Sequence, residues 1–486
     1  MSQNNPDTPT PKEETLEKKP KGRSSIDMTE GAPAKKLLLF CIPLLLGNIM
    51  QQLYNTVDSM VVGRFVSSNA LAAVGASGPI IHLMVAFFMG LSAGASILIS
   101  QSFGAKEYKK LEDTIHTILS LTLIVSVVIA AVGAAISPLI LRLLNTPEEV
   151  FPMANTYMII TFIGIISLML YNLINAVLHG TGDARSPFII LVICCIINII
   201  LDLVFVLAFD WGVAGVAWAT VIAQTCSVVF GLWRINTGDK VFRIHLKKLR
   251  PTKSIVLSIL RLGVPSGAQN ALSSVGNILV QSVINSFGPV IMAANVAVIK
   301  VDSFCTMPIM TFGTAVTVFV GQNAGAGKND RIKDGVRSAL MMSVGISLVI
   351  SIVLFLWGNY PLALFTQEQA VIQAGMDKFH RVAPFYFCMA VFGVFSGAIR
   401  GQGYAIAPML IGVGTMFVGR VPVAFLLSRA IGANGIHWSL SVQWALEAVI
   451  IVLYYHFGGW QKKAAQLKEK REREAAAQAA ASGKSA

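Results

Sequence analysis

The sequence predicts an all-α integral membrane protein with about twelve transmembrane helices in two parallel six-helix repeats. Its composition is the first observation: 54% of the 486 residues are hydrophobic and 13% are charged, whereas soluble domains average about 25% charged residues. The second is that uncharged runs of about 18 residues or more recur from Leu37 to Trp460, each long enough for a membrane helix. A β-barrel would instead show alternating segments of about ten residues.

The third observation is an internal repeat. Gln101 to Gly104 matches Gln322 to Gly325 at an offset of 221 residues, and the same offset aligns the Gly180 turn with the Gly401 turn. Pro43 pairs with Pro265 at an offset of 222. Six spans per repeat is an even number, so both halves enter the membrane from the same side. Such parallel repeats enclose a cavity near the membrane midplane.

The expected spans follow from these runs. In the first half they are 36–64, 70–100, 113–141, 151–178, 187–208 and 212–234, and in the second half 255–286, 290–321, 334–358, 371–399, 405–428 and 435–458. The chain is thereby divided into a disordered polar tail (1–35), an N-lobe (36–234), a basic linker (235–254), a C-lobe (255–460) and a basic C-terminal tail (461–486).

Charge predicts the orientation. Lysine and arginine gather in alternate loops and in both tails, so the positive-inside rule places both termini in the cytoplasm. With no cleavable signal peptide expected, this pattern suits a bacterial inner membrane. The net charge of +13 is explained by these loops and by anionic lipid, and nucleic acid is not an expected partner. The six cysteines fall in apolar spans without metal-site spacing.

A polar stripe in the first span points to a functional site. Gln51, Tyr54 and Asp58 are spaced i, i+3, i+7 and share one helical face. An acid in the membrane costs about 2.5–3.5 kcal/mol even on a lenient insertion scale, so it faces protein or a wet cavity.

A second polar group is expected beside the first. Asn198 and Asp202 share a face of the fifth span at i, i+4, while Thr220 and Tyr157 lie at a similar depth on the sixth and fourth. Their oxygen atoms suit H⁺ or a small cation such as Na⁺, for which Asp58, Asn198, Asp202 and Thr220 are the expected ligands. Two neighbouring acids cannot both stay ionised at low cost. The alternative is that both acids are structural and bonded to neighbouring helices.

The chain resembles the MATE (multidrug and toxic compound extrusion) family over about 420 residues. The matching features are residues 54–64 (YNTVDSMVVGR), residues 70–75 (ALAAVG), the paired Gln/Gly loops, residues 180–183 (GTGD) and the pair Asn198 and Asp202. The resemblance implies a V-shaped pair of six-helix bundles that exports organic, often cationic, compounds against H⁺ or Na⁺.

It also implies site roles. In the branch of the family that couples through the N-lobe, the polar network corresponds here to Gln51, Tyr54, Asp58, Tyr157, Asn198, Asp202 and Thr220. Asn175 would line the substrate chamber together with Gln51, Tyr54 and Tyr157. The other branch carries acids on spans seven and ten. Here span seven shows Gln269, Asn270 and Ser273 instead, and span ten has no acid between Ala383 and Ala398, so a C-lobe cation site of that type is not expected.

Charged residues in the C-lobe form a second set of candidates. Lys300 and Asp302 are two residues apart, so they do not share a face and are not expected to pair with each other. Arg420 and Glu447 lie at similar depths and are expected to form a buried ion pair.

The predicted function is secondary antiport that exports organic drugs or metabolites in exchange for H⁺ or Na⁺. A flippase of lipid-linked precursors, and less favourably a channel or receptor, stay open as alternatives. No enzyme and no cofactor are expected, because no nucleophile–base pair or phosphate-binding motif occurs. Expected partners are small organic compounds and membrane lipid, and a monomer is expected.

Overall fold

The computed structural model describes residues 25–66, 68–144, 146–237, 243–244 and 249–460, with 466 and 469, and over these residues it contains helices and no strands. The predicted all-α fold is confirmed. The first half contains α1 (Pro33–Val61), α2 (Ser68–Gly104), α3 (Tyr108–Leu143), α4 (Phe151–Gly180), α5 (Arg185–Leu203) and α6 (Gly212–Thr237). The second half contains α7 (Lys253–Asn285), α8 (Pro289–Gly325), α9 (Asn329–Trp357), α10 (Asn359–Ala363), α11 (Gln369–Val382), α12 (Tyr386–Gly401), α13 (Ile406–Gly414), α14 (Val421–Ile431) and α15 (Ala433–Phe457).

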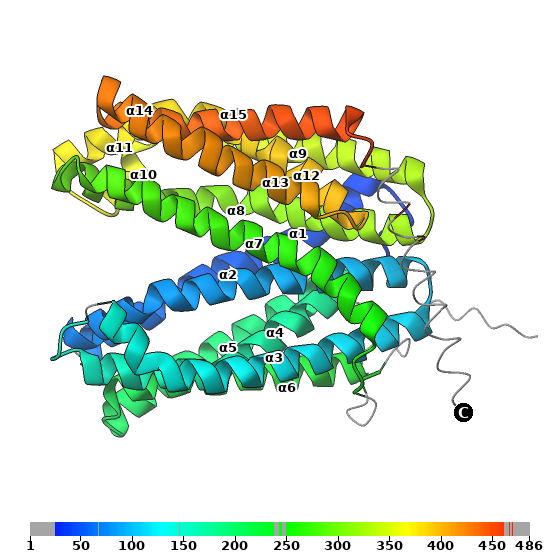
Figure 1. Ribbon diagram of the computed structural model, residues 1–486, viewed down its shortest axis with the longest axis horizontal. Helices are drawn as coiled ribbons and strands as arrows, with labels where there is room; N and C mark the ends of the chain where they lie inside the picture. Colours follow the sequence, from blue (N-terminus) through cyan, green and yellow to red (C-terminus); the bar gives the residue numbers. More distant parts are fainter. Residues whose placement is uncertain are drawn as a thin grey trace, which may run out of the picture.

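Eleven stretches among the described residues are long and apolar enough to cross a membrane. Helix α7 has 33 residues but is not one of them, because polar side chains such as Arg261, Gln269 and Asn270 lower its hydropathy. It nevertheless runs through the bundle with the other long helices (Figure 1). The twelve expected spans therefore correspond to eleven apolar helical stretches and one polar long helix.

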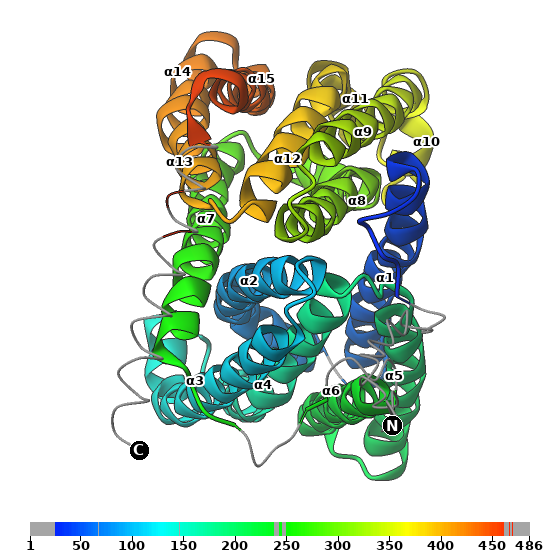
Figure 2. The same ribbon diagram turned by 90° about the vertical axis from the view of Figure 1, so that its right-hand side faces the viewer.

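Two helices cross between the lobes. Leu37 and Phe40 at the start of α1 pack in a core with Phe312 of α8, whereas Val61 at its end packs with Val213 of α6. Likewise Ile259 at the start of α7 packs in the core of α2–α6, and Val280 near its end packs with Ala424 of α14. Figure 2 shows α1 and α7 on opposite flanks of the molecule. The beginning of each half of the chain thus packs among the helices of the other half.

We use N-lobe for α2–α6 with the second half of α1, and C-lobe for α8–α15 with the second half of α7.

The backbone supports the internal repeat seen in the sequence. Three turns in the left-handed region recur at offsets of 220 or 221: Lys106 and Gly327, Gly182 and Gly403, and Gly212 and Gly432. The first two pairs lie where the basic loops gather, and we call that end of the bundle the basic end.

The expected tenth span, 371–399, is broken. A 3-10 turn at Ala383–Phe385 separates α11 from α12. Pro384 sits in this turn, and proline removes a helical hydrogen bond and its ring crowds the preceding turn. The break sets the direction of α11, which carries Lys378.

Residues 25–32 differ from the disordered tail expected over 1–35. Met28 is fully buried, and its backbone N–H donates to Oε1 of Gln322 at 3.0 Å while its carbonyl accepts from Asn323 and Arg331. The N–H of Ile26 donates to the carbonyl of Gly182 at 3.0 Å. This segment therefore touches both lobes at the basic end. Pro33, Ala34 and Lys35 of the expected tail begin α1, and residues 1–24 lie outside the described residues.

Candidate functional site

Two acids from different helices meet in the N-lobe. Asp58 of α1 is half-buried and Asp202 of α5 is fully buried, and their carboxyl groups lie close enough to interact as a hydrogen-bonding pair. Ionised carboxylates only accept hydrogen bonds, so such a bond requires a proton on one of them. Oδ1 of each acid is also buried without a hydrogen-bond partner among the described residues. The arrangement can therefore bind a proton or a small cation.

Local backbone structure places the acids. Asp58 precedes a π-helical segment at Val62–Val66, and Asp202 precedes another at Val204–Ala208. The π-helical turns are rare and are frequent at functional sites, because they rotate one stretch of helix relative to the next. The i, i+4 spacing predicted that Asn198 and Asp202 share a face, and the structure places them in contact.

Asn198 holds Asp202. In the amide orientation that satisfies its surroundings, Nδ2 of Asn198 donates to Oδ2 of Asp202 at 3.1 Å, and its Oδ1 accepts from the backbone N–H of Thr220 at 3.3 Å. The hydroxyl of Thr220 donates to the carbonyl of Val216 at 3.1 Å and accepts a long hydrogen bond of 3.5 Å from Tyr54. Asn198 and Thr220 thus join α5 to α6 beside the acid pair.

The other expected site residues divide into two groups. Tyr157 of α4 lies within electrostatic range of both Asp58 and Asp202, so the structure brings it to the cluster. Gln51 is half-buried on α1 and makes no hydrogen bond that the described residues show. Asn175 interacts with Tyr171 on α4, and it follows Tyr157 by 18 residues, which is about 27 Å along a helix. Asn175 therefore lies away from the acids.

The donor set can be tested against the two candidate ions. A sodium ion needs several oxygen ligands. Oδ1 of Asp58 and Oδ1 of Asp202 are available, but the amide oxygen of Asn198 is turned toward the Thr220 N–H. No group of three or more acidic, histidine or cysteine side chains with metal-site geometry occurs in the part of the chain that the structure describes. Two carboxyl oxygens suit a shared proton better than a fully coordinated Na⁺.

The C-lobe contains a polar cluster that the sequence analysis only partly identified. Nζ of Lys378 on α11 donates to Oδ1 of Asn295 on α8 at 2.8 Å, and Nδ2 of Asn295 donates to Oε1 of Gln281 on α7 at 3.0 Å. Lys378 is 7% exposed. Asp302 lies within electrostatic range of Lys378 and accepts a hydrogen bond from the Tyr386 hydroxyl. This acid therefore has a basic side chain near it.

Lys378 lies within the expected tenth span, 371–399, and is not among the site residues that the sequence predicts. A signal was present, because Lys378 stands at an offset of 221 from Tyr157 and so at the corresponding place in the second repeat. Lys300 is exposed on α8, while Asp302 faces Tyr386 and Lys378. The two residues point in different directions, as their spacing predicts.

The expected ion pair between Arg420 and Glu447 is corrected by the structure. Arg420 donates instead to Oδ1 of Asn277 at 2.8 Å, while Oε1 of Glu447 accepts from Thr415 at 3.1 Å and from Gln443 at 2.9 Å. No salt bridge joins the two side chains among the described contacts, although they interact electrostatically. Matching depth along two helices did not fix the direction of either side chain.

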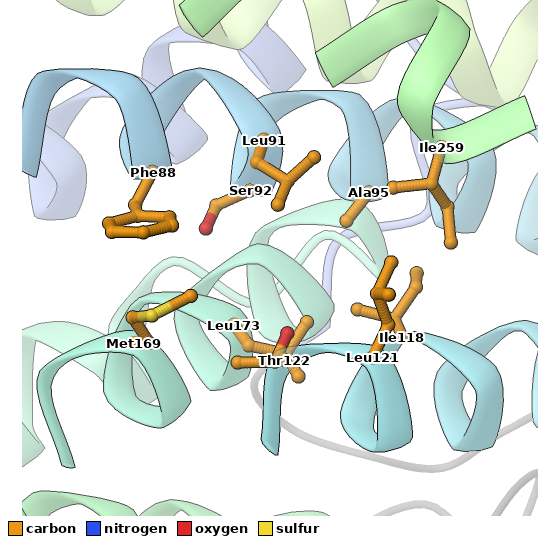
Figure 3. A pocket seen from close by; sticks show the side chains of 10 residues that line it. All are labelled: Phe88, Leu91, Ser92, Ala95, Ile118, Leu121, Thr122, Met169, Leu173 and Ile259. Atoms are coloured by element: carbon orange, nitrogen blue, oxygen red, sulfur yellow. The ribbon is translucent and has the colours of Figure 1, made fainter. Parts of the chain in front are cut away.

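A small cavity lies inside the N-lobe between α2, α3 and α4, and Ile259 of α7 closes one side (Figure 3). Its volume of about 10 Å³ has room for roughly one water molecule. Its lining is mostly apolar, with hydroxyl groups from Ser92 and Thr122. It is too small for an organic substrate.

Comparison with known proteins points to one group of transporters. The family model MatE matches residues 43–204 and 265–426, one match in each half of the chain. The probable multidrug resistance protein YpnP of Bacillus subtilis is 31% identical over 422 residues, covering 87% of this chain and 94% of the relative. The probable multidrug resistance protein YoeA of the same organism is 32% identical, covering 81% and 87% respectively.

Solved structures agree on the fold. A structure described as the outward-facing conformation of a multidrug resistance MATE family transporter superposes with a TM-score of 0.84 at 22% identity, covering 92% of this chain and 100% of that chain. A transporter of the MOP superfamily from Pyrococcus furiosus superposes with a TM-score of 0.82 at 22% identity, covering 90% and 98%.

Proposed function

The chain belongs to the MATE family of multidrug transporters, and from that premise we propose that it exports organic, often cationic, compounds in exchange for a cation bound at the Asp58–Asp202 pair. It is a multi-pass membrane transporter and not an enzyme, and transporters of this family need no cofactor. We place it in a bacterial cytoplasmic membrane with both termini inside. The basic loops at one end and the bacterial relatives support that orientation.

One observation carries the coupling proposal. Asp58 and Asp202 belong to different helices of the N-lobe, yet their carboxyl groups interact directly in a buried place. Two ionised carboxylates at hydrogen-bonding distance repel each other strongly where water is scarce. Binding of one cation removes the repulsion, and release of the cation restores it. Cation binding therefore changes the force between α1 and α5.

The remaining N-lobe residues take supporting roles in this scheme. Asn198 positions Asp202 by donating to Oδ2, and Thr220 holds Asn198 through its backbone N–H. Tyr54 reaches the Thr220 hydroxyl, and Tyr157 lies beside both acids. We favour H⁺ over Na⁺ as the coupling ion, because the amide oxygen of Asn198 is already used. Gln51 and Asn175 are proposed to contact substrate.

The experiment uses the purified protein in proteoliposomes loaded with ethidium, an organic cation. A pH gradient, a sodium gradient and no gradient are imposed in separate runs. We expect the pH gradient to drive ethidium movement and the sodium gradient at equal pH to have no effect. A reversed preference would replace H⁺ by Na⁺ in the scheme and leave the acid pair in place.

Two variants test the acid pair itself. Asp58→Asn and Asp202→Asn keep the size of each side chain but remove its charge. We expect both to lose gradient-driven transport while their abundance in the membrane and their unfolding temperature stay near those of the wild type. Gradient-driven export by both variants at the wild-type rate would rule out coupling at this pair.

A further inference from the structure

The lobes meet at the basic end through two glutamines related by the repeat. Nε2 of Gln101 on α2 donates to the carbonyl of Gly401 at 2.8 Å, which lies at the end of α12 in the C-lobe. Nε2 of Gln322 on α8 donates to the carbonyl of Gly180 at 3.0 Å, which lies at the end of α4 in the N-lobe. The two donors, Gln101 and Gln322, are 221 residues apart, and so are the two acceptors, Gly180 and Gly401. Each lobe therefore holds the other by the same bond.

Two glycines allow the glutamines to approach. A Cβ atom on Gly104 would lie 1.9 Å from the carbonyl oxygen of Gln322, and one on Gly325 would lie 2.0 Å from the carbonyl oxygen of Gln101. These glycines are also an offset of 221 apart. Any side chain at either position would push α2 and α8 apart. The contact is thus a reciprocal arrangement of helix ends and not a single chance hydrogen bond.

We propose that Gln101 and Gln322 form a clasp that closes the basic end between the lobes and that the transport cycle has to open. A transporter exposes its central cavity to one side at a time, so the side that is closed needs a contact that can break and re-form. Two hydrogen bonds to backbone carbonyls suit this task. Each is specific in direction, and each contributes only a modest free energy because its partners can bond to water when the seam opens.

The N-terminal segment makes the two halves of the clasp unequal. Gln322 is fully buried, and its Oε1 also accepts from the backbone N–H of Met28. Gln101 is half-buried. Lys328 and Arg331 hold the same segment by donating to the carbonyls of Thr29, Glu30 and Gly31. Removing the side-chain amide of Gln322 therefore affects α8, the end of α4 and the N-terminal segment. Removing that of Gln101 affects only α2 and the end of α12.

The test measures the separation of the lobes directly. Nitroxide labels are attached at Lys109→Cys on α3 and Lys333→Cys on α9, both exposed residues near the basic end, after the six native cysteines have been replaced. Electron–electron resonance then gives the populations with the seam closed and open. We expect Gln101→Leu to raise the open-to-closed ratio roughly threefold, Gln322→Leu by more, and the double variant by about tenfold or more.

Gln402→Leu is the matched control, because Gln402 is a glutamine of the same end whose side chain makes no hydrogen bond among the described residues. An unchanged ratio in the double variant, or an equal change in the control, would refute the clasp. The clasp rests on the proposed transport function for its purpose, but this measurement needs neither substrate nor coupling ion. It can therefore fail independently of the acid pair.

A cross-link tests the same seam without altering the glutamines. Ala105 and Ala326 follow the two glycines and occupy equivalent places in the repeats, and a Cβ atom on Gly325 would lie 2.9 Å from the backbone nitrogen of Ala105. Ala105→Cys with Ala326→Cys, joined by a short bifunctional thiol reagent with a cleavable disulfide, should stop ethidium transport until reductant is added. Transport at the uncross-linked rate with the bridge intact would show that this seam does not open.

Discussion

The two lobes have the same helical plan but different charge at their polar centres. In the N-lobe, Asp58 and Asp202 face each other, and among the described residues no basic side chain forms a salt bridge with either. In the C-lobe, Asp302 lies near Lys378 and Glu447 lies within the field of Arg420. The C-lobe acids are therefore balanced by side chains of the same lobe. The N-lobe acids have no such basic partner among the described contacts, and this difference supports the proposal that a cation from outside binds in the N-lobe.

The repeat makes the comparison specific. The position that holds Tyr157 in the N-lobe holds Lys378 in the C-lobe, at an offset of 221. An ammonium group beside an acid neutralises the acid permanently, whereas a bound cation neutralises it only while it stays bound. Placing the side chain of one lobe in the other should therefore transfer its behaviour.

The largest expected effect comes from Tyr157→Lys. The new ammonium would lie beside Asp58 and Asp202, where a charge pair at short distance is strongly favoured if water is scarce. We expect the acids to be neutralised permanently and gradient-driven ethidium transport to fall to the background of empty vesicles. Tyr157→Met, which has similar length and no charge, is the control and should keep most of the activity. Loss of transport in both variants would mean that the tyrosine itself is required.

Lys378→Met breaks the balance in the C-lobe. Removing one partner of a buried salt bridge costs about 3–5 kcal/mol because the other charge stays buried. Lys378 acts on Asp302 through its charge, no salt bridge joins them among the described contacts, and Asp302 keeps its bond from Tyr386. We therefore expect a loss below about 3 kcal/mol, read as a lower unfolding temperature in detergent. Adding Asp302→Asn should restore part of it, since no charge is then left uncompensated. Equal destabilisation of the single and double variants would show that Lys378 does not stabilise the protein through its interaction with Asp302.

A smaller effect is expected from Asn198→Leu. This change removes the donor to Oδ2 of Asp202 and the acceptor for the Thr220 N–H, but it leaves both acids in place. A hydrogen bond to a charged group contributes about 1.5–3 kcal/mol, so we expect the transport rate at a fixed pH gradient to change roughly tenfold. Thr225→Val is the control, since it removes a 2.8 Å contact with Ser167 in the same lobe. A control effect as large as that of Asn198→Leu would indicate a general packing defect.

These residues also show what the sequence predicts well. Helical periodicity placed Asn198 and Asp202 on one face, and depth counted from span ends placed Asp58 and Tyr157 at the same level. Both inferences need only a regular helix. The fold followed from hydropathy and from the repeat, because offsets between matching motifs do not depend on side-chain direction.

The C-lobe was harder to predict for a physical reason. Counting depth from span ends assumes straight helices, and the tenth span is broken at Ala383–Phe385. The direction of a long side chain is not encoded in hydropathy, so the sequence did not identify Lys378 as a site residue and wrongly paired Arg420 with Glu447. The packing of Met28 at the seam likewise depends on contacts between distant segments.

The smallest effect on coupling is expected from Asn175→Ala. Asn175 interacts with Tyr171 and lies about 27 Å along α4 from Tyr157, well outside the reach of the acid pair. We therefore expect the dependence of transport on the pH gradient to change by less than about twofold, since a single neutral hydrogen bond contributes only about 1 kcal/mol and acts here far from the ion. The ethidium concentration at half-maximal rate should change instead, because Asn175 is proposed to contact substrate. Parallel titrations of proton gradient and ethidium separate the two quantities, and a gradient dependence as altered as that of Asn198→Leu would extend the coupling site along α4.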